Sequence, residues 1–202
     1  MSRFIAFEGG EGAGKTTQIS LLADYLRARG HDVVTTREPG GTPGAEAIRS
    51  LLVEGAAGRW TAESDSLLFA AARADHVARL IRPALAAGKI VLCDRFVHST
   101  FAYQGGGNGL DMDKLRALHD FCSGGLWPDL VLWLDLPPQE GLRRAAARHA
   151  GVDRFEQRDS NFHARVHAAF AQMAGEDSRM RRIDAMQGVD AVAAAIRQAM
   201  EA

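Results

Sequence analysis

Short apolar runs alternate along this chain with longer segments in which apolar residues recur every three or four positions. The runs predict strands at 3–7, 33–36, 90–93, 130–134 and, more weakly, 180–184. The segments between them predict helices at 15–29, 44–54, 63–87, 111–122, 138–149, 157–174 and 189–200. Strands that alternate with helices are typical of an α/β fold, with a parallel sheet covered by helices on both faces.

The domain organisation predicted from the sequence is a single unit spanning 1–202. The chain contains no internal repeat, no low-complexity tract and no linker that would divide it. A domain of this length buries roughly 70% of the surface that its unfolded chain exposes, so it needs no disulfide or metal to be stable. Pro83 lies inside the helical pattern at 63–87 and should kink that helix or mark its last turns.

Composition and charge narrow the class of protein. Apolar residues make up 47% of the chain and charged residues 24%, which is ordinary for a soluble globular protein. The formal net charge of −1 gives no overall basic field, so we expect neither nucleic acid nor a membrane as partner. Cys93 and Cys122 form no zinc or disulfide pattern, and the first strand leaves no room for a signal peptide. We therefore expect a cytoplasmic protein.

The segment FEGGEGAGKTTQ, residues 7–18, carries the pattern G-x-x-x-x-G-K-[ST] between a predicted strand and a predicted helix. Its glycines let backbone N–H groups turn toward phosphate oxygens, and the following helix N-terminus favours an anion. Lys15 adds a charge near the β- and γ-phosphates, and the Thr16 hydroxyl can ligate Mg²⁺. The sequence thus predicts a P-loop NTPase fold, with a loop that holds the phosphates of a nucleotide together with Mg²⁺. The predicted ATP-binding residues are Gly9, Gly10, Glu11, Gly12, Ala13, Gly14, Lys15, Thr16 and Thr17.

Two predicted strands end in an aspartate that could hold the Mg²⁺ ion, Asp94 and Asp135. Arg95 follows Asp94 directly, which places a guanidinium at the edge of the sheet where open α/β folds bind ligands. Asp135 precedes two prolines and can also be interpreted as a helix cap. We favour Asp94 as the metal ligand.

A second basic cluster lies at about 143–158, and from 141 to 152 no acidic residue interrupts it. Its arginines are Arg143, Arg144, Arg148, Arg154 and Arg158. Such a segment is typical of a lid that closes over a transferring phosphoryl group. A solvated helix face is the alternative interpretation.

The P-loop alone does not distinguish among GTPases, motors, switches and kinases. The nearest match to the guanine-reading N-K-x-D pattern begins at Asn108, lacks the lysine and follows no strand. A chain of 202 residues is also too short for a motor with its appendages. A small P-loop kinase remains, and the acceptor of its phosphoryl group is the open question.

Several longer motifs resemble the thymidylate kinase family, in that family's order and spacing. They are TREPGGT (36–42), DRF (94–96), STFAYQGGG (99–107), DLVLWLDLPP (129–138) and DRFE (153–156). The P-loop has no arginine before Lys15, whereas the predicted lid is rich in arginine, and this combination is similar to the bacterial members. The resemblance implies transfer of the γ-phosphoryl group of ATP to dTMP, giving dTDP and ADP for the synthesis of dTTP and DNA replication.

The resemblance also implies a homodimer, for which the long apolar helix at 63–87 offers a candidate surface. Two rival functions stay open: a kinase of another small acceptor, such as a different nucleoside monophosphate, and a non-catalytic ATP-binding switch. The first would prefer another acceptor, and the second would show slow turnover with any acceptor.

For the nucleoside of dTMP, the resemblance implies that Phe69 stacks on the thymine ring and that Arg73, one helical turn later, donates to a base carbonyl. Ordinary core packing is the alternative interpretation of Phe69. Gln104 would bind the base edge, and Tyr103 would pack against C2′ of the sugar beside Thr100. Glu11 would reach the 3′-hydroxyl.

For the phosphates, the resemblance implies a clamp of Arg95 and Arg49, with Glu38 at the dTMP site and beside Mg²⁺ together with Asp94. Lys15 and Arg95 would act on the moving phosphoryl group. The lid would supply a further arginine, first Arg148, then Arg144 and Arg154.

Overall fold

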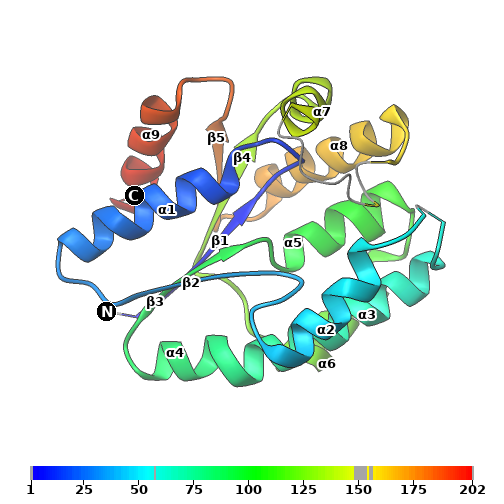
Figure 1. Cartoon of the computed structure of the whole chain (residues 1–202), viewed down its shortest axis with the longest axis horizontal. Helices are drawn as coiled ribbons and strands as arrows, with labels where there is room; N and C mark the ends of the chain where they lie inside the picture. The colour runs from blue at the N-terminus through cyan, green and yellow to red at the C-terminus, as the bar shows by residue number, and fades with distance from the viewer. Residues whose placement is uncertain (1, 57, 148–153, 155–156, 202) are drawn as a thin grey trace.

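The computed structural model describes residues 2–56, 58–147, 154 and 157–201. Five strands form one parallel sheet in the order β2-β3-β1-β4-β5 (Figure 1). The strands are β1 (Arg3–Glu8), β2 (Val33–Arg37), β3 (Ile90–Asp94), β4 (Leu130–Asp135) and β5 (Met180–Asp184). The predicted α/β class and all the predicted strands are confirmed, each to within a residue of its predicted end.

The register of the sheet brings three strand ends together. Phe7 of β1 pairs with Asp94 of β3, and Asp94 pairs on its other side with Arg37 of β2. The backbone continues this pairing past the strands, because the Arg95 N–H donates to the Phe7 carbonyl and the Glu38 N–H donates to the Asp94 carbonyl, each at 2.9 Å. The segments that follow β1, β2 and β3 therefore share one edge of the sheet.

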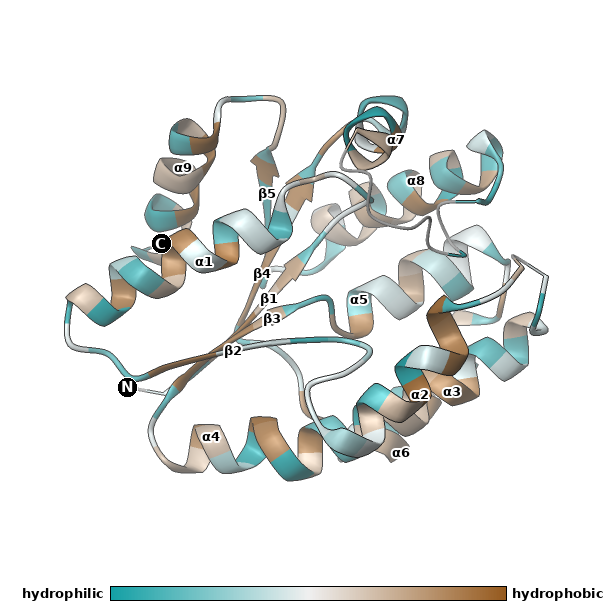
Figure 2. Ribbon diagram, in the orientation of Figure 1, coloured by the Kyte–Doolittle hydropathy of each residue, from teal (hydrophilic) through white to brown (hydrophobic). Residues whose placement is uncertain are grey.

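Alternate residues of the strands pack into hydrophobic clusters on opposite faces of the sheet. Ile5 and Phe7 point to the face that α1 (Lys15–Ala28) and α9 (Val189–Glu201) cover. Phe4 and Ala6 point to the opposite face. In Figure 2 the strands are largely brown, while the helices around them carry both brown and teal residues. This pattern is expected of a parallel sheet buried on both faces.

The remaining helices cover the second face and the edge of the sheet. They are α2 (Pro43–Val53), α3 (Ala62–His76), α4 (Arg82–Ala86), α5 (Val97–Thr100), α6 (Met112–Ser123), α7 (Pro138–Ala146) and α8 (Ser160–Glu176), with π-helical segments η1 (Val77–Ile81) and η2 (Phe101–Gly107). Each predicted helical segment contains a helix, although α8 begins at Ser160 and not at residue 157 as predicted. Among these residues no helix has both the length and the apolar character needed to cross a membrane.

The helix predicted at 63–87 is continuous but not uniform. It runs from α3 through the π-helical turn η1 into α4. Pro83 lies in the first turn of the short helix α4. Because α4 is the last part of the combined helix, which ends at Ala86, the proline marks the last turns of the predicted helix, as expected. A π-turn beside a proline is reasonable, because proline lacks an N–H and its ring displaces the preceding carbonyl.

The segment 97–107 is helical, although it was not among the predicted helices. α5 and η2 form a helix that ends in three consecutive glycines, which ordinarily disfavour helices. Gly105 faces Met112 of α6, and the other two glycines face α8, which packs directly against η2. A Cβ on Gly106 would lie 2.6 Å from the Cβ of Ala169, and one on Gly107 would lie 2.5 Å from the ring of Phe162. The close approach of two helices therefore requires these glycines.

His119 makes the stability of the fold depend on pH. The ring is buried on α6, its Nε2–H donates to the Leu126 carbonyl at 3.0 Å, and it packs against Trp127 with ring centroids 4.7 Å apart. Burial, reinforced by the Arg73 charge, lowers the pKa of His119 to about 4. In the unfolded chain His119 has an ordinary pKa near 6.5. Below that pH the unfolded chain therefore binds a proton at His119 that the folded chain does not bind.

We therefore expect the free energy of unfolding to fall as the pH drops from about 6.5 to about 4, by roughly 2 kcal/mol from this residue. Urea unfolding at pH 7.5 and pH 4.5 measures the difference. His119→Phe keeps the aromatic packing and removes the proton site, so its stability should change less over the same interval. Equal changes in both proteins would show that His119 does not set this dependence.

Candidate active site

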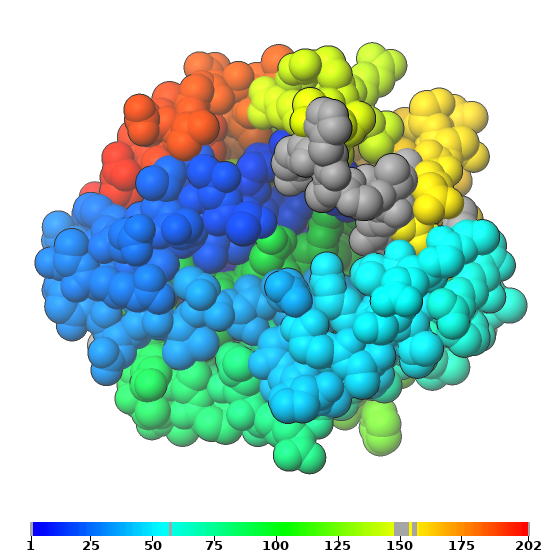
Figure 3. Space-filling model, viewed as in Figure 1, coloured from blue at the N-terminus to red at the C-terminus, as the bar shows by residue number. Residues whose placement is uncertain are grey.

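A cleft of about 230 Å³ opens where β1, β2 and β3 end. In Figure 3 the surface is hollowed between the blue segment that contains α1 and the cyan segment that contains α2 and α3. The cleft brings together most residues that the sequence analysis singled out: 11–17, Glu38, Arg49, Phe69, Arg73, Asp94, Arg95, Thr100, Tyr103 and Gln104.

The P-loop forms one wall of the cleft and leads directly into α1. Gly14 adopts a left-handed conformation, with φ 88°, and the helix begins at Lys15 without a side-chain cap. Its first N–H groups therefore lack intrahelical partners and face the cleft, as in other helix N-termini that bind anions. The Lys15 ammonium donates to the carbonyls of Gly9 at 3.2 Å and Gly10 at 3.0 Å. Burial and the neighbouring Arg95 lower the pKa of Lys15.

Thr16 and Asp94 meet at the floor of the cleft. The Thr16 hydroxyl donates to Asp94 Oδ2 at 3.3 Å, and Asp94 Oδ1 is buried without a hydrogen-bond partner among the described residues. A carboxylate with an unused oxygen beside a hydroxyl suits a hard cation such as Mg²⁺, which prefers oxygen ligands. Asp135 lies elsewhere, and its two oxygens accept from His167 Nε2 at 2.7 Å and Arg182 Nε at 2.6 Å.

Arg95 occupies the centre of the cleft in an unusual backbone conformation. Its φ of 67° is left-handed, which costs free energy for a residue other than glycine. Hydrogen bonds hold it there: the guanidinium donates to the Gly9 carbonyl at 2.8 Å, to Ser99 Oγ at 3.2 Å and to Glu11 Oε1 at 2.5 Å. This turn directs the charge across the P-loop.

Glu11 forms the centre of a small charged cluster. Its carboxylate also accepts from the Tyr103 hydroxyl at 3.2 Å, while the Arg95 guanidinium lies 5.1 Å from the centre of the Tyr103 ring. Burial alone would favour the neutral acid, but Arg95 and Lys15 overcome it and hold the pKa of Glu11 below its usual range. Glu11 is therefore ionised at neutral pH.

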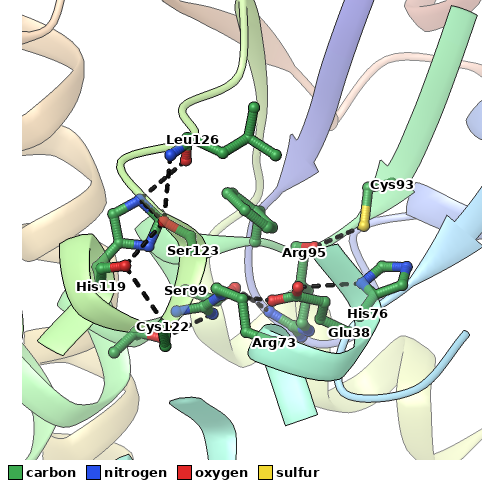
Figure 4. Close-up of polar contacts among 12 residues, drawn as sticks. Glu38, Arg73, His76, Cys93, Arg95, Ser99, His119, Cys122, Ser123 and Leu126 are labelled. Carbon is green, nitrogen blue, oxygen red and sulfur yellow. Dashed lines mark hydrogen bonds and ion pairs between the residues drawn. The ribbon is translucent and has the colours of Figure 1, made fainter. Parts of the chain in front are cut away.

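The opposite wall comes from α3. Arg73 is buried, and its Nε donates to Glu38 Oε2 at 2.8 Å (Figure 4). Its Nη2 donates to Thr100 Oγ1 at 2.9 Å. The second Glu38 oxygen lies 3.1 Å from His76 Nδ1. Burial raises the pKa of Glu38, but Arg73 and His76 outweigh it and the net shift is downward. The place of Glu38 beside Mg²⁺ stays a prediction.

The other predicted residues of the acceptor end also line the cleft. Phe69 lies one helical turn before Arg73 and is half-buried rather than part of the core. Gln104 is buried, and its Nε2 has no hydrogen-bond partner in the part of the chain that the structure describes. Arg49 donates to the Pro39 carbonyl at 2.8 Å. An unsatisfied amide and a half-exposed ring in one cleft are consistent with a flat polar ligand.

None of the described arginines of the predicted lid lines the cleft. Arg154 is buried away from it, where Nη2 pairs with Asp65 at 2.7 Å and Nε donates to the Leu52 carbonyl at 2.9 Å. Arg144 donates to Glu140 at 2.7 Å and to the Ala185 carbonyl at 3.1 Å. Arg148, the first choice for the lid arginine, lies outside the described residues.

Sequence reasoning missed several residues of the site. Glu8 is completely buried beneath Arg95 and accepts from the N–H of Phe96 at 2.9 Å and from the Ser99 hydroxyl at 2.5 Å. Arg37 also lines the cleft. A charged residue at the end of an otherwise apolar strand was the available signal for Glu8, and Arg37 lay within the quoted TREPGGT motif. His76 had no recognisable signal.

The chain is similar to known proteins over nearly its whole length. The family model described as thymidylate kinase matches residues 7–196. A thymidylate kinase of Rhizorhabdus wittichii is 54% identical over 200 residues, 98% of this chain and 96% of that protein. A thymidylate kinase of Caulobacter vibrioides is 56% identical over 194 residues, 96% of this chain and 93% of that protein.

A solved structure agrees with the sequence comparisons. The crystal structure of thymidylate kinase from Ehrlichia chaffeensis superposes with a TM-score of 0.81 at 33% sequence identity, and the alignment covers 98% of both chains. The similarity therefore extends over the sheet and the helices around the cleft.

Proposed function

The chain belongs to the thymidylate kinase family, and we infer from this membership that it transfers the γ-phosphoryl group of ATP to dTMP, giving dTDP and ADP. One observation supports this function above all. The P-loop and the pocket formed by Phe69, Arg73 and Gln104 line the same cleft, so a phosphate donor and a pyrimidine acceptor can bind side by side. The sequence relationship favours dTMP over another small acceptor.

The donor binds at the P-loop. The N–H groups at the start of α1 and the Lys15 ammonium provide positive potential for the β- and γ-phosphates. Lys15 uses two carbonyls of the loop to orient its ammonium, which retains a third N–H for a phosphate oxygen. Thr16 and Asp94 would hold Mg²⁺ with the donor. That ion would supply positive charge to neutralise the donor phosphates.

The nucleobase of the acceptor binds between α3 and η2. Phe69 offers its ring face for stacking, and Arg73 and Gln104 supply N–H groups for the carbonyls at the base edge. The buried Gln104 amide supports this assignment, because a polar group without a partner costs free energy until a ligand satisfies it. Such a site rejects ligands that lack the matching acceptor.

The sugar and phosphate of the acceptor lie toward the P-loop. Tyr103 and Thr100 would line the sugar, and Glu11 would accept from its 3′-hydroxyl. Arg95 and Arg49 would clamp the 5′-phosphate between the base pocket and the donor. The hydrogen bonds of Arg95 fix its charge before the substrate binds, so little reorganisation is required in the transition state.

The chemical step needs mainly alignment and charge neutralisation. The attacking group is a 5′-phosphate oxygen of dTMP, which is largely ionised near neutral pH, so no general base has to remove a proton. The γ-phosphorus–oxygen bond to ADP breaks as the new bond forms in line. Lys15 and Arg95 stabilise the charge on the moving group, and we assign a further contribution to Arg148 of the lid.

The enzyme is proposed to act in the cytoplasm. Cys93 and Cys122 are both free thiols in the structure, which suits a reducing compartment.

A homodimer is proposed to form through the face made by α2, α3 and α6, which pack against one another at one end of the molecule (Figure 1). Three apolar side chains are exposed on these helices: Leu51 at 40%, Leu67 at 59% and Phe121 at 88%. A phenylalanine so far from the core is costly to leave in water, and a second copy of the chain would cover it.

A coupled assay of ADP release with dTMP, dUMP, UMP, dCMP and AMP tests the proposed reaction. We expect dTMP to give the highest kcat/KM. Lys15→Ala should lower kcat about 10³-fold, because it removes a charge directed at the transferring phosphoryl group. Near-normal turnover by a folded Lys15→Ala protein would contradict the role of the P-loop, and preference for another acceptor would contradict the substrate.

Tyr103 should determine whether the sugar is deoxyribose or ribose. If its ring fills the space of a 2′-hydroxyl, kcat/KM for dTMP should exceed that for ribothymidine monophosphate, and Tyr103→Ala should narrow the gap. Tyr103→Phe keeps the ring but loses the bond to Glu11, so the discrimination should survive. An unchanged ratio in Tyr103→Ala would remove Tyr103 from the sugar pocket.

Phe121→Asp should convert the dimer into monomers, because it places a charge in the proposed interface. Sedimentation velocity at micromolar concentration measures the species. Leu21→Asp, on α1 at the opposite face of the sheet, is the matched control and should remain dimeric. A wild-type chain that sediments as a monomer would refute the dimer.

A further inference from the structure

Several side-chain hydrogen bonds join the last turn of α3 to the loop that follows β2, and some of them have no part in the proposed mechanism. Arg73 pairs with Glu38, and Asp75 Oδ2 accepts from the Thr42 hydroxyl at 2.5 Å. The ring of His76 contacts both the end of β2 and the loop after it, with Nε2 2.7 Å from Thr36 Oγ1 and Nδ1 3.1 Å from Glu38 Oε1. His76 itself does not line the cleft.

The partners of His76 determine where its proton lies. Glu38 is ionised and can only accept hydrogen bonds, so Nδ1 must carry a proton and donate it to Oε1. In the neutral ring Nε2 is then an acceptor, which the Thr36 hydroxyl satisfies. Both ring nitrogens are therefore used in one orientation, and a flipped ring would lose both bonds.

Packing also restricts the orientation of the His76 ring. His76 is completely buried, and Gly41, with φ 87°, lies directly against it. A Cβ on Gly41 would lie 2.5 Å from Thr36 Oγ1 and 2.7 Å from His76 Nε2. The loop thus closes over the ring, and only glycine permits that approach.

Glu38 connects the fixed His76 ring to Arg73 in the cleft. One of its oxygens is held by His76, and the other holds Arg73 Nε, which leaves the guanidinium directed at Thr100 Oγ1 and the acceptor pocket (Figure 4). Arg73 also lies 5.0 Å above the ring of Phe96. Without a donor at its second oxygen, the buried carboxylate would be unsatisfied and free to turn, and Arg73 would turn with it.

We propose that His76 is a positioning residue for the acceptor: through its Nδ1–H bond to Glu38 it sets the direction of Arg73 and so the affinity for the pyrimidine of the nucleoside monophosphate. The proposal rests on the proposed function, because it assigns Arg73 to the base. It differs from a merely structural role, in which any side chain that fills the space and keeps the fold would serve equally well.

Two amide substitutions separate the ring's two bonds. His76→Asn places an N–H where Nδ1 lies and gives up the contact with Thr36. His76→Gln reaches the position of Nε2 and gives up the bond to Glu38. We expect Asn to leave the KM and calorimetric Kd for dTMP within about threefold of wild type. We expect Gln to raise both about tenfold while kcat changes less than about threefold, since ground-state binding is affected rather than the transfer.

His167→Gln is the matched control, since His167 also pairs with a carboxylate, that of Asp135 at 2.7 Å, but lies outside the main cleft. Its dTMP affinity should not change. Equal effects of Asn and Gln at position 76, or a loss confined to kcat, would overturn the proposal. Absence of dTMP turnover and dTMP binding in the wild type would instead refute the proposed function, and the positioning role with it.

A measurement on the wild type covers the case in which a variant does not fold. Long-range ¹H–¹⁵N NMR at pH 8 reports which nitrogen of the His76 ring is protonated. The proposal requires a proton on Nδ1. A ring protonated at Nε2 alone could not donate to Glu38 and would overturn it.

Discussion

The parallel pairing of β1 with β3 is the constraint on which the rest of the site depends. It places Phe7 opposite Asp94, so the P-loop leaves the sheet beside the turn that carries Arg95. The Arg95 N–H then bonds the Phe7 carbonyl, and its side chain returns to the carbonyl of Gly9. Parallel strands end at a common edge, and the connections between them are free to carry chemistry there.

Two guanidinium groups at this edge are held in place by carboxylate partners, one pair buried and the other partly exposed. Arg95 is paired with Glu11, and Arg73 with Glu38. A buried charge without a partner costs several kcal/mol, and buried pairs stabilise a fold only weakly even when their geometry is good. Their value here lies in direction: both guanidinium groups are fixed before a nucleotide enters, which lowers the reorganisation needed on binding and in the transition state.

In the segment from Val97 to Gly107, packing against α8 on one side fixes the side chains that face the cleft on the other side. Its glycines allow α8 to approach η2 closely, and this contact holds Tyr103 and Gln104 toward the cleft. Arg154 shows the opposite case. Its sequence neighbourhood indicates a lid, yet its side chain satisfies Asp65 and a carbonyl of α2 instead.

The sequence by itself determined the strands, most of the helices, the P-loop and the family. These features depend on local periodicity and on glycine, lysine and threonine at fixed spacing, which are readable without knowing which segments meet. A resemblance carried by several motifs also predicted an acceptor pocket, and its predicted residues line one cleft in the structure. It failed at α5 and η2, because glycines that are helix breakers by propensity serve here as contact surfaces for another helix.

Only the tertiary structure decided which charges face one another. Asp94 and Asp135 both end apolar strands in the sequence. The fold leaves an oxygen of Asp94 without a partner among the described residues, whereas both oxygens of Asp135 are occupied by His167 and Arg182. The link between His76 and Glu38 joins residues 38 positions apart and has no periodicity to reveal it. Such partnerships follow from the order of strands and the packing of helices, and so they appear only when the whole chain is folded.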